Sequence, residues 1–204
     1  MSEQIKGSKI ELGAQNVYLK EAGAFTGEIS PNMILDTGAT WSIIGHSERR
    51  TYFGDDDKTI NAKILMALKS GLKVIFCVGE TLEQREQELT EEIVSAQLEW
   101  GLQGVPKRAL DKIIIAYEPV WAIGTGKTAT PEQAQDVHAF IRDILSTFYN
   151  EEASQQMTIL YGGSMKPENA DGLLAKPDID GGLIGGACLK ADSFISLIKS
   201  SENN

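Results

Sequence analysis

Short β-branched runs alternate along this sequence with longer segments whose apolar residues recur at helical spacing. The runs that predict strands cover residues 10–17, 41–44, 73–78, 113–116, 158–161 and 182–184. The segments that predict helices cover residues 31–36, 57–70, 82–100, 131–149, 167–175 and 191–199. Because strand, helix and strand follow one another repeatedly, we expect an α/β fold in which helices wrap a parallel sheet.

The helix predicted at residues 131–149 has a start that the sequence specifies closely. Thr130 offers an N-cap hydroxyl, Pro131 occupies the first helical position, and Gln133 stands three residues after the cap. His138 lies next to the apolar face of this helix, and we interpret it as structural. The acidic run at residues 55–57 precedes another predicted helix, and we interpret it as capping and solvation, not as a metal site.

The charge balance argues against two classes of partner. The chain carries 19 basic and 29 acidic residues, so nucleic acid and anionic membranes are poor partners for it. The charge does not exclude a small anionic substrate, because backbone N–H groups can bind an anion despite the negative net charge. No apolar run approaches the roughly 18 residues of a membrane span, and residues 1–4 do not begin a signal peptide.

Two cysteines and two histidines do not suggest a metal site or a cofactor. Cys77 and Cys188 stand far apart beside apolar or small residues, so we expect buried, reduced thiols in a cytoplasmic protein. His46 and His138 each stand alone, without the ligand spacing that a metal requires. We therefore expect no cofactor and no metal.

Chemically informative residues follow the predicted strands. Parallel strands end at one edge of a sheet, so the loops that follow them open side by side. His46, Glu80 and Glu118 each follow one strand, and the glycine pairs at 162–163 and 185–186 follow the last two. This edge is where we expect the functional site.

Glu118 stands at the tip of the strand at residues 113–116. Pro119 removes a backbone donor and takes the chain out of the sheet, and four apolar residues follow at 120–123. Gly124 and Gly126 then supply flexible backbone. A carboxylate under an apolar flap suggests a base beneath a moving lid. The alternative is a plain buried strand end with a packed loop.

The two glycine pairs and His46 extend this hypothesis. Glycines between a strand and a helix let backbone N–H groups approach a phosphate, although glycine also serves tight turns. A lone histidine is more often structural, but His46 shares its edge with Glu118. Glu118 would take a proton from a carbon beside a carbonyl while His46 polarises the oxygen. Glu48 would support that site, unless it forms a surface salt bridge with Arg49 or Arg50.

Several strings in this sequence resemble the triosephosphate isomerase family. They are Gly-His-Ser-Glu-Arg-Arg at 45–50, the stretch 117–131, Tyr-Gly-Gly-Ser at 161–164 and Gly-Gly-Ala at 185–187, with further matches at 13–16 and 23–30. The strings occur in the family's order over essentially the whole chain. The resemblance implies a TIM-type (β/α) barrel and the interconversion of dihydroxyacetone phosphate and D-glyceraldehyde 3-phosphate, a step of glycolysis and gluconeogenesis. Another phosphate-binding barrel enzyme would not explain these specific strings.

The resemblance also implies a role for each site residue. Glu118 is the base, His46 stabilises the enediolate as a neutral imidazole, and Glu48 is the acid beside them. The phosphate would be held by Gly124, Ser164, Gly185 and Gly186. The lid would comprise Pro119, Val120, Trp121, Ala122, Ile123, Thr125, Gly126 and Lys127, and would reach Ala129. Thr26 lies on the loop that, in this family, enters the pocket of a partner subunit, which implies a homo-oligomer.

One part of the family pattern has no counterpart in this sequence. The family begins with a strand that ends in an Asn-x-Lys loop, and the present match starts just before the third strand. We therefore expect an incomplete barrel, about six of eight βα units, forming a single domain over residues 1–204. Without the lysine of the Asn-x-Lys loop, substrate binding would be weaker. The open strand edges would be covered by a dimer, by an altered assembly, by a rearrangement or by a separate N-terminal polypeptide. Two readings stay open: an isomerase, or a non-catalytic barrel remnant that binds phosphate or self-associates.

Overall fold

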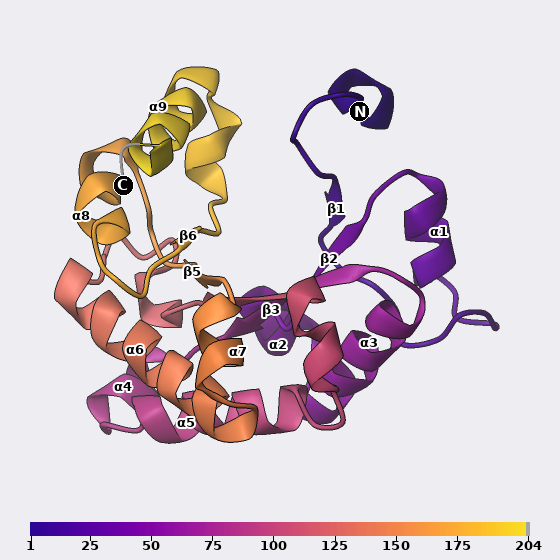
Figure 1. The fold of residues 1–204 in the computed structure, drawn as a ribbon, viewed down its shortest axis with the longest axis horizontal. Helices are drawn as coiled ribbons and strands as arrows, with labels where there is room; N and C mark the ends of the chain where they lie inside the picture. Colours follow the sequence, from indigo (N-terminus) through magenta and orange to yellow (C-terminus); the bar gives the residue numbers. More distant parts are fainter. Residues whose placement is uncertain (203–204) are drawn as a thin grey trace. The chain divides into compact units, whose positions relative to one another are not determined.

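The computed structural model describes residues 1–202, and the chain forms two compact units. Unit 1 contains residues 1–77 and 98–114, and unit 2 contains residues 78–97 together with the chain from residue 115 onward. Each unit combines parallel strands with helices, as Figure 1 shows. The α/β class predicted from the alternation of strand and helix patterns is therefore confirmed. The expectation of one domain over residues 1–204 stays a prediction.

Unit 1 holds three parallel strands in chain order. They are β1 (Gly13–Ala14), β2 (Trp41–Ile44) and β3 (Lys73–Val78), the last residue of which belongs to unit 2. Trp41 pairs with Gly13 on one side and with Lys73 on the other. The helices of this unit are η1 (Ser2–Ile5), α1 (Pro31–Asp36), α2 (Ser47–Phe53), α3 (Asp57–Lys69) and η2 (Lys107–Lys112).

The core of unit 1 lies between its strands and α3. Ile60 and Ile64 on the helix are fully buried, as are Ile44 and Phe76 on the strands. Packing is close enough that a Cβ at Gly101 would meet the Phe76 ring at 2.2 Å.

The acidic run before α3 behaves only partly as expected. Asp56 is the N-cap of α3 and accepts a hydrogen bond from the Thr59 N–H at 2.7 Å, so the capping interpretation is confirmed. Asp55 is neither a cap nor solvated. Its buried carboxylate accepts from Lys63 Nζ at 2.5 Å and from Arg49 Nε at 2.9 Å. A buried carboxylate of this kind needs such partners, and the sequence pattern did not show them.

Unit 2 likewise holds strands in chain order. They are β4 (Ile113–Tyr117, beginning in unit 1), β5 (Ile159–Tyr161) and β6 (Gly181–Gly182), with Tyr117 opposite Tyr161 and Tyr161 opposite Gly182. The other elements are α4 (Leu82–Glu86), α5 (Thr90–Gly101, ending in unit 1), η3 (Val120–Ala122), α6 (Pro131–Phe148), α7 (Glu151–Gln156), α8 (Pro167–Leu174), η4 (Gly186–Leu189) and α9 (Ala191–Glu202).

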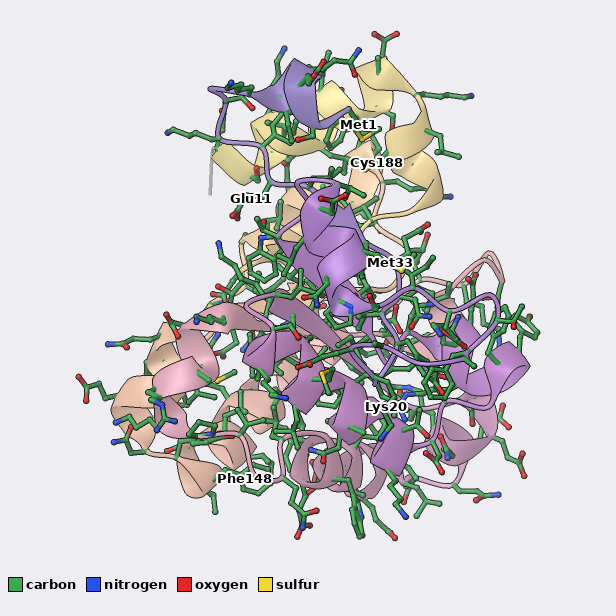
Figure 2. All side chains as sticks on the ribbon, turned by 90° about the vertical axis from the view of Figure 1, so that its right-hand side faces the viewer. Met1, Glu11, Lys20, Met33, Phe148 and Cys188 are labelled. Atoms are coloured by element: carbon green, nitrogen blue, oxygen red, sulfur yellow. The ribbon has the colours of Figure 1, made fainter. Side chains whose placement is uncertain are left out.

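Helix α6 begins as its sequence specifies. The Thr130 hydroxyl accepts from the Gln133 N–H at 3.1 Å, and the Gln133 side chain accepts from the Thr130 N–H at 3.0 Å. The helix buries one apolar face, consisting of Ala134, Val137, Ile141 and Leu145. Phe148 continues the helical spacing of this face, and we would expect it to be buried from the sequence, but it is 37% exposed at the helix end (Figure 2). His138 is buried and its Nδ1 lies 3.0 Å from the Asp178 carbonyl, in line with a structural role.

Other expected elements differ from the structure. The strand runs predicted at 10–17 and 182–184 give only the two-residue strands β1 and β6, which stand at the end of the strand order in their units. A strand with one neighbour gains fewer ladder hydrogen bonds. The single helix predicted at 82–100 is divided into α4 and α5, and the sequence did not predict α2 or α7. The two cysteines are not joined in a disulfide, and only Cys77 is buried, whereas Cys188 is partly exposed.

Candidate active site

Glu118 directly follows β4 and is only 2% exposed. Its N–H donates to the Val78 carbonyl at 2.7 Å, which continues the hydrogen bonding of the strands one residue beyond β4. The sequence placed this carboxylate at a strand tip, and the structure places it there. Its side chain is thereby held by the backbone of a rigid element.

Glycines on both sides leave room for Glu118. A Cβ at Gly162 would lie 2.8 Å from Glu118 Cγ, and one at Gly79 would lie 1.8 Å from the Glu118 carbonyl oxygen. A Cβ at Gly79 would collide with backbone, and one at Gly162 would displace the Glu118 side chain. The Gly162 N–H donates to the Tyr117 carbonyl at 2.7 Å, so this glycine joins two strand ends. Gly79 and Gly162 therefore serve the close packing of backbone around the carboxylate.

The predicted lid has an anchored beginning and an exposed middle. Trp121 and Ala122, in η3, are buried, and the Ala122 carbonyl accepts from the Ser164 N–H at 3.0 Å. Residues 124–128 are exposed, and Gly124 and Gly126 adopt φ values of +67° and +82°, which favour glycine. The Thr125 hydroxyl donates to the Trp121 carbonyl at 2.7 Å. Ala129 is buried again, so the loop is fixed at both ends.

A carboxylate to which the sequence assigned no role anchors the start of this loop. Glu80, fully buried after β3, accepts from Trp121 Nε1 at 2.9 Å and from the Tyr117 hydroxyl at 3.1 Å. Arg85 pairs with the same carboxylate at 3.1 Å and stacks on the Trp121 ring, with 4.6 Å to its centroid. Burial, and next the Glu80 charge, raises the pKa of the Tyr117 hydroxyl well above its usual range. The only sequence signal for Glu80 was its place after a strand.

The predicted phosphate ligands lie in unit 2 with Glu118 and the lid. Ser164 follows β5, and its N–H is already engaged by the lid. Gly185 and Gly186 stand at the start of η4, where an added Cβ would meet no atom within 4 Å. The space beside these two glycines is therefore open, unlike the space beside Gly162.

His46 is the N-cap of α2 in unit 1. Its Nδ1 accepts from the Glu48 N–H at 3.2 Å, an arrangement that leaves the proton of a neutral imidazole on Nε2. Glu48 Oε2 lies 4.0 Å from the same Nδ1. The N–H contact is the stronger of the two, because the Glu48 side chain is 67% exposed and an ion pair there is weak.

Thr26 is exposed in the loop between Tyr18 and Ile29 of unit 1. The Tyr18 N–H donates to the Ile29 carbonyl at 2.9 Å and closes the loop at its base. The rings of Tyr18 and Phe25 lie 4.7 Å apart and contact each other within the loop. The loop is thus an ordered projection with Thr26 near its tip.

The structure therefore brings together one part of the predicted site within unit 2: Glu118, the lid and Ser164. Gly185 and Gly186 belong to the same unit. His46, Glu48 and Thr26 belong to unit 1.

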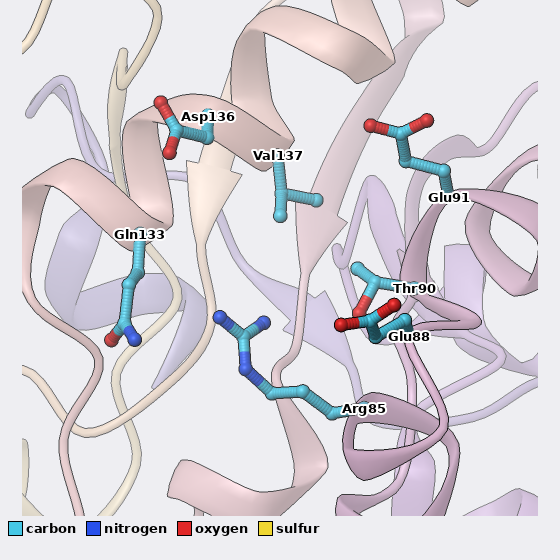
Figure 3. A pocket seen from close by; sticks show the side chains of 7 residues that line it. All are labelled: Arg85, Glu88, Thr90, Glu91, Gln133, Asp136 and Val137. Carbon is cyan, nitrogen blue, oxygen red and sulfur yellow. The ribbon is translucent and has the colours of Figure 1, made fainter.

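Unit 2 also has a cleft of about 280 Å³, shown in Figure 3, whose wall includes Arg85. Its other lining residues come from the α4–α5 connection, the start of α5 and the first turns of α6: Glu88, Thr90, Glu91, Gln133, Asp136 and Val137. Three of these side chains are acidic, so the cleft does not suit a phosphate. Over residues 1–202, no group of three or more His, Cys, Asp or Glu residues could hold a metal ion. Within the same residues, no helix is both long and apolar enough to cross a membrane.

In TIM-type barrel enzymes, parallel strands alternate with helices and the active site is built from the loops that follow the strands, and the position of Glu118 and its loop agrees with this layout. The family model described as triosephosphate isomerase matches residues 1–201 of this chain. The chain belongs to the triosephosphate isomerase family.

Individual relatives agree with the family model. The chain is 52% identical to the triosephosphate isomerase of Geotalea uraniireducens over 97% of its length and 79% of the relative. It is 54% identical to that of Carboxydothermus hydrogenoformans, covering 98% of this chain and 80% of the relative. For Geobacter metallireducens the values are 56%, 95% and 77%.

Proposed function

We propose that this protein is a triosephosphate isomerase, which interconverts dihydroxyacetone phosphate and D-glyceraldehyde 3-phosphate without a cofactor. The single observation that carries the proposal is the buried Glu118 carboxylate, held at the end of β4 beside an anchored loop. Membership of the family supplies the substrate, a triose phosphate.

The proposed chemistry assigns one proton transfer and one hydrogen bond. Glu118 removes a proton from one carbon of the substrate and returns it to the neighbouring carbon. His46 Nε2–H donates to the oxygens of the enediolate, since its Nδ1 accepts from the Glu48 N–H. A glutamate base with a neutral histidine is the pairing for which this enzyme family is itself the standard example. Glu48 supports His46 through its backbone N–H.

The proposed lid and phosphate site complete the enzyme. Residues 119–129 close over the substrate and exclude water, which keeps the enediolate from losing phosphate. The phosphate binds to the N–H groups of Gly124, Gly185 and Gly186 and to the Ser164 hydroxyl. The open space beside Gly185 and Gly186 supports this assignment.

We further propose that the protein acts in the cytoplasm, in glycolysis and gluconeogenesis, as a homo-oligomer. The exposed and ordered loop around Thr26 supports the oligomer, because an ordered projection suits insertion into a second subunit.

An isomerase assay coupled to the consumption of glyceraldehyde 3-phosphate tests the function, with Glu118→Gln as the matched variant. We expect turnover by the purified chain and a fall in kcat of about 10²–10⁴-fold in the variant, because the amide cannot accept the substrate proton. Equal turnover by both proteins would contradict the assignment of Glu118. Absence of turnover in both would favour the non-catalytic remnant, and inorganic phosphate titrations would then test whether it still binds phosphate.

A further inference from the structure

Arg50 lies on α2 and reaches back to the turn that carries His46. Its Nε donates to the carbonyl of Gly45, the residue immediately before His46, at 2.9 Å. One terminal nitrogen donates to the Cys77 carbonyl, near the end of the neighbouring strand β3, at 3.3 Å. A single planar guanidinium therefore ties the backbone next to His46 to a rigid strand of unit 1.

The other end of this guanidinium is fixed as well. Its second terminal nitrogen pairs with Asp57 Oδ1, on the first residue of α3, at 2.5 Å. The Arg50 side chain is only 19% exposed. Hydrogen bonds that involve a charged donor are stronger than neutral ones, and the fork of an arginine loses little freedom in forming several at once. The position of Arg50 is thus set by three partners.

Gly45 explains why such a restraint matters. Its φ of +81° suits glycine, and a Cβ there would lie 3.0 Å from the Cys77 carbonyl oxygen. Glycine is the residue with the least conformational restriction of its own. The backbone before His46 therefore owes its rigidity to the hydrogen bonds around it, among them the bond from Arg50.

We propose that Arg50 is a positioning residue for the isomerisation, which holds the Gly45–His46 turn so that the imidazole keeps one orientation and one tautomer. The proposal rests on the function proposed above, in which His46 donates to the enediolate. A displacement of about 1 Å in a group that contacts the reacting atoms is enough to reduce a rate about 10²-fold.

The test compares Arg50→Lys with Arg49→Lys. Arg49 lies on the same helix and loses a comparable guanidinium contact, but its Nε donates to Asp55 and not to Gly45. We expect Arg50→Lys to lower kcat by about 10–100-fold with KM changed less than twofold. Arg49→Lys should change kcat less than threefold. Thermal unfolding of both variants measures any general loss of stability.

A spectroscopic readout separates positioning from stability. The chain has only two histidines, so the ¹⁵N resonances of His46 and His138 are readily assigned. In the wild-type protein we expect His46 to show one neutral tautomer, with the proton on Nε2. Arg50→Lys should shift its resonances toward a mixture of tautomers, and Arg49→Lys should leave them unchanged.

Two results would overturn the proposal: an unchanged kcat in Arg50→Lys, or equal losses in both variants with an unchanged His46 spectrum. If the wild-type protein itself shows no turnover, the proposed function fails, and the His46 spectra still decide whether Arg50 holds the imidazole. If Arg50→Lys does not fold, hydrogen exchange of the wild-type Arg50 Nε–H replaces it. Slow exchange supports the proposal, and exchange as fast as in free arginine overturns it.

Discussion

At the scale of single residues, His138 couples the stability of the fold to pH. Burial lowers the pKa of its imidazole to about 4. In an unfolded chain the same group has a pKa of about 6.5, so between those two values the unfolded state binds a proton that the folded state does not. Stability should therefore fall as the pH drops from about 6.5 to 4.

Urea unfolding at pH 7 and pH 5 measures this effect. We expect the free energy of unfolding to be lower at pH 5 by about 2 kcal/mol, since each pH unit in this window costs about 1.4 kcal/mol. A His138→Asn variant should lose most of that pH dependence. The expectation would be wrong if the wild-type protein and the variant showed the same dependence.

Single residues also show what the sequence could and could not predict. Glu118 and His46 could be singled out because each follows a strand, and the positions of strand ends depend on local patterns. Glu80 follows a strand too, but its partners Tyr117 and Trp121 lie 37 and 41 residues away. Neither composition nor periodicity predicts contacts between residues so far apart in the chain. Gly162 could be interpreted from the sequence as part of a phosphate-binding turn. Its packing against Glu118, 44 residues earlier in the chain, is seen only in the structure.

At the scale of elements, a left-handed residue separates α4 from α5. Glu88 has φ +59°, and it is the only non-glycine residue in the left-handed region of φ within residues 1–202. This conformation costs a residue with a Cβ about 1–2 kcal/mol, and it ends a helix. A glycine here would have predicted the break. Glutamate is a good helix former, so the sequence predicted one continuous helix over 82–100 instead.

Replacing Glu88 by glycine should therefore stabilise the protein. We expect a gain of about 0.5–1 kcal/mol, because relief of the left-handed strain exceeds the entropy that glycine loses on folding. Removing one of the three acidic side chains around the cleft also stabilises the fold, because it reduces the repulsion between like charges. Urea unfolding measures the change, and Glu86→Gly is the control, since Glu86 is also exposed but lies in α4. The control should be destabilised; a similar loss in both variants would contradict the argument.

At the scale of the whole molecule, the order of strands and helices was predictable and their exact ends were less so. The bounds of β2, β3 and α1 agree with the sequence, because β-branched runs and a capped helix start define them locally. Family resemblance supplied the TIM-type fold, which the family model then confirmed. The oligomeric state could not be predicted from local sequence patterns, because association depends on surfaces formed by residues that lie far apart in the chain.

The loop around Thr26 allows the predicted oligomer to be tested without a change of fold. Phe25 is 40% exposed and Ile29 is 47% exposed, so the loop presents apolar surface that a partner subunit would cover.

Two chains with a net charge of −10 each repel one another, and a general gain of positive charge should strengthen their association. Thr26→Lys is expected to do the opposite and weaken it at least tenfold, because the ammonium group would have to leave water at the interface. Thr147→Lys makes the same change of charge on the exposed side of α6 and should not weaken association. Sedimentation at several concentrations measures both, and a wild-type protein that stays monomeric, or two variants that behave alike, would remove the loop from the interface.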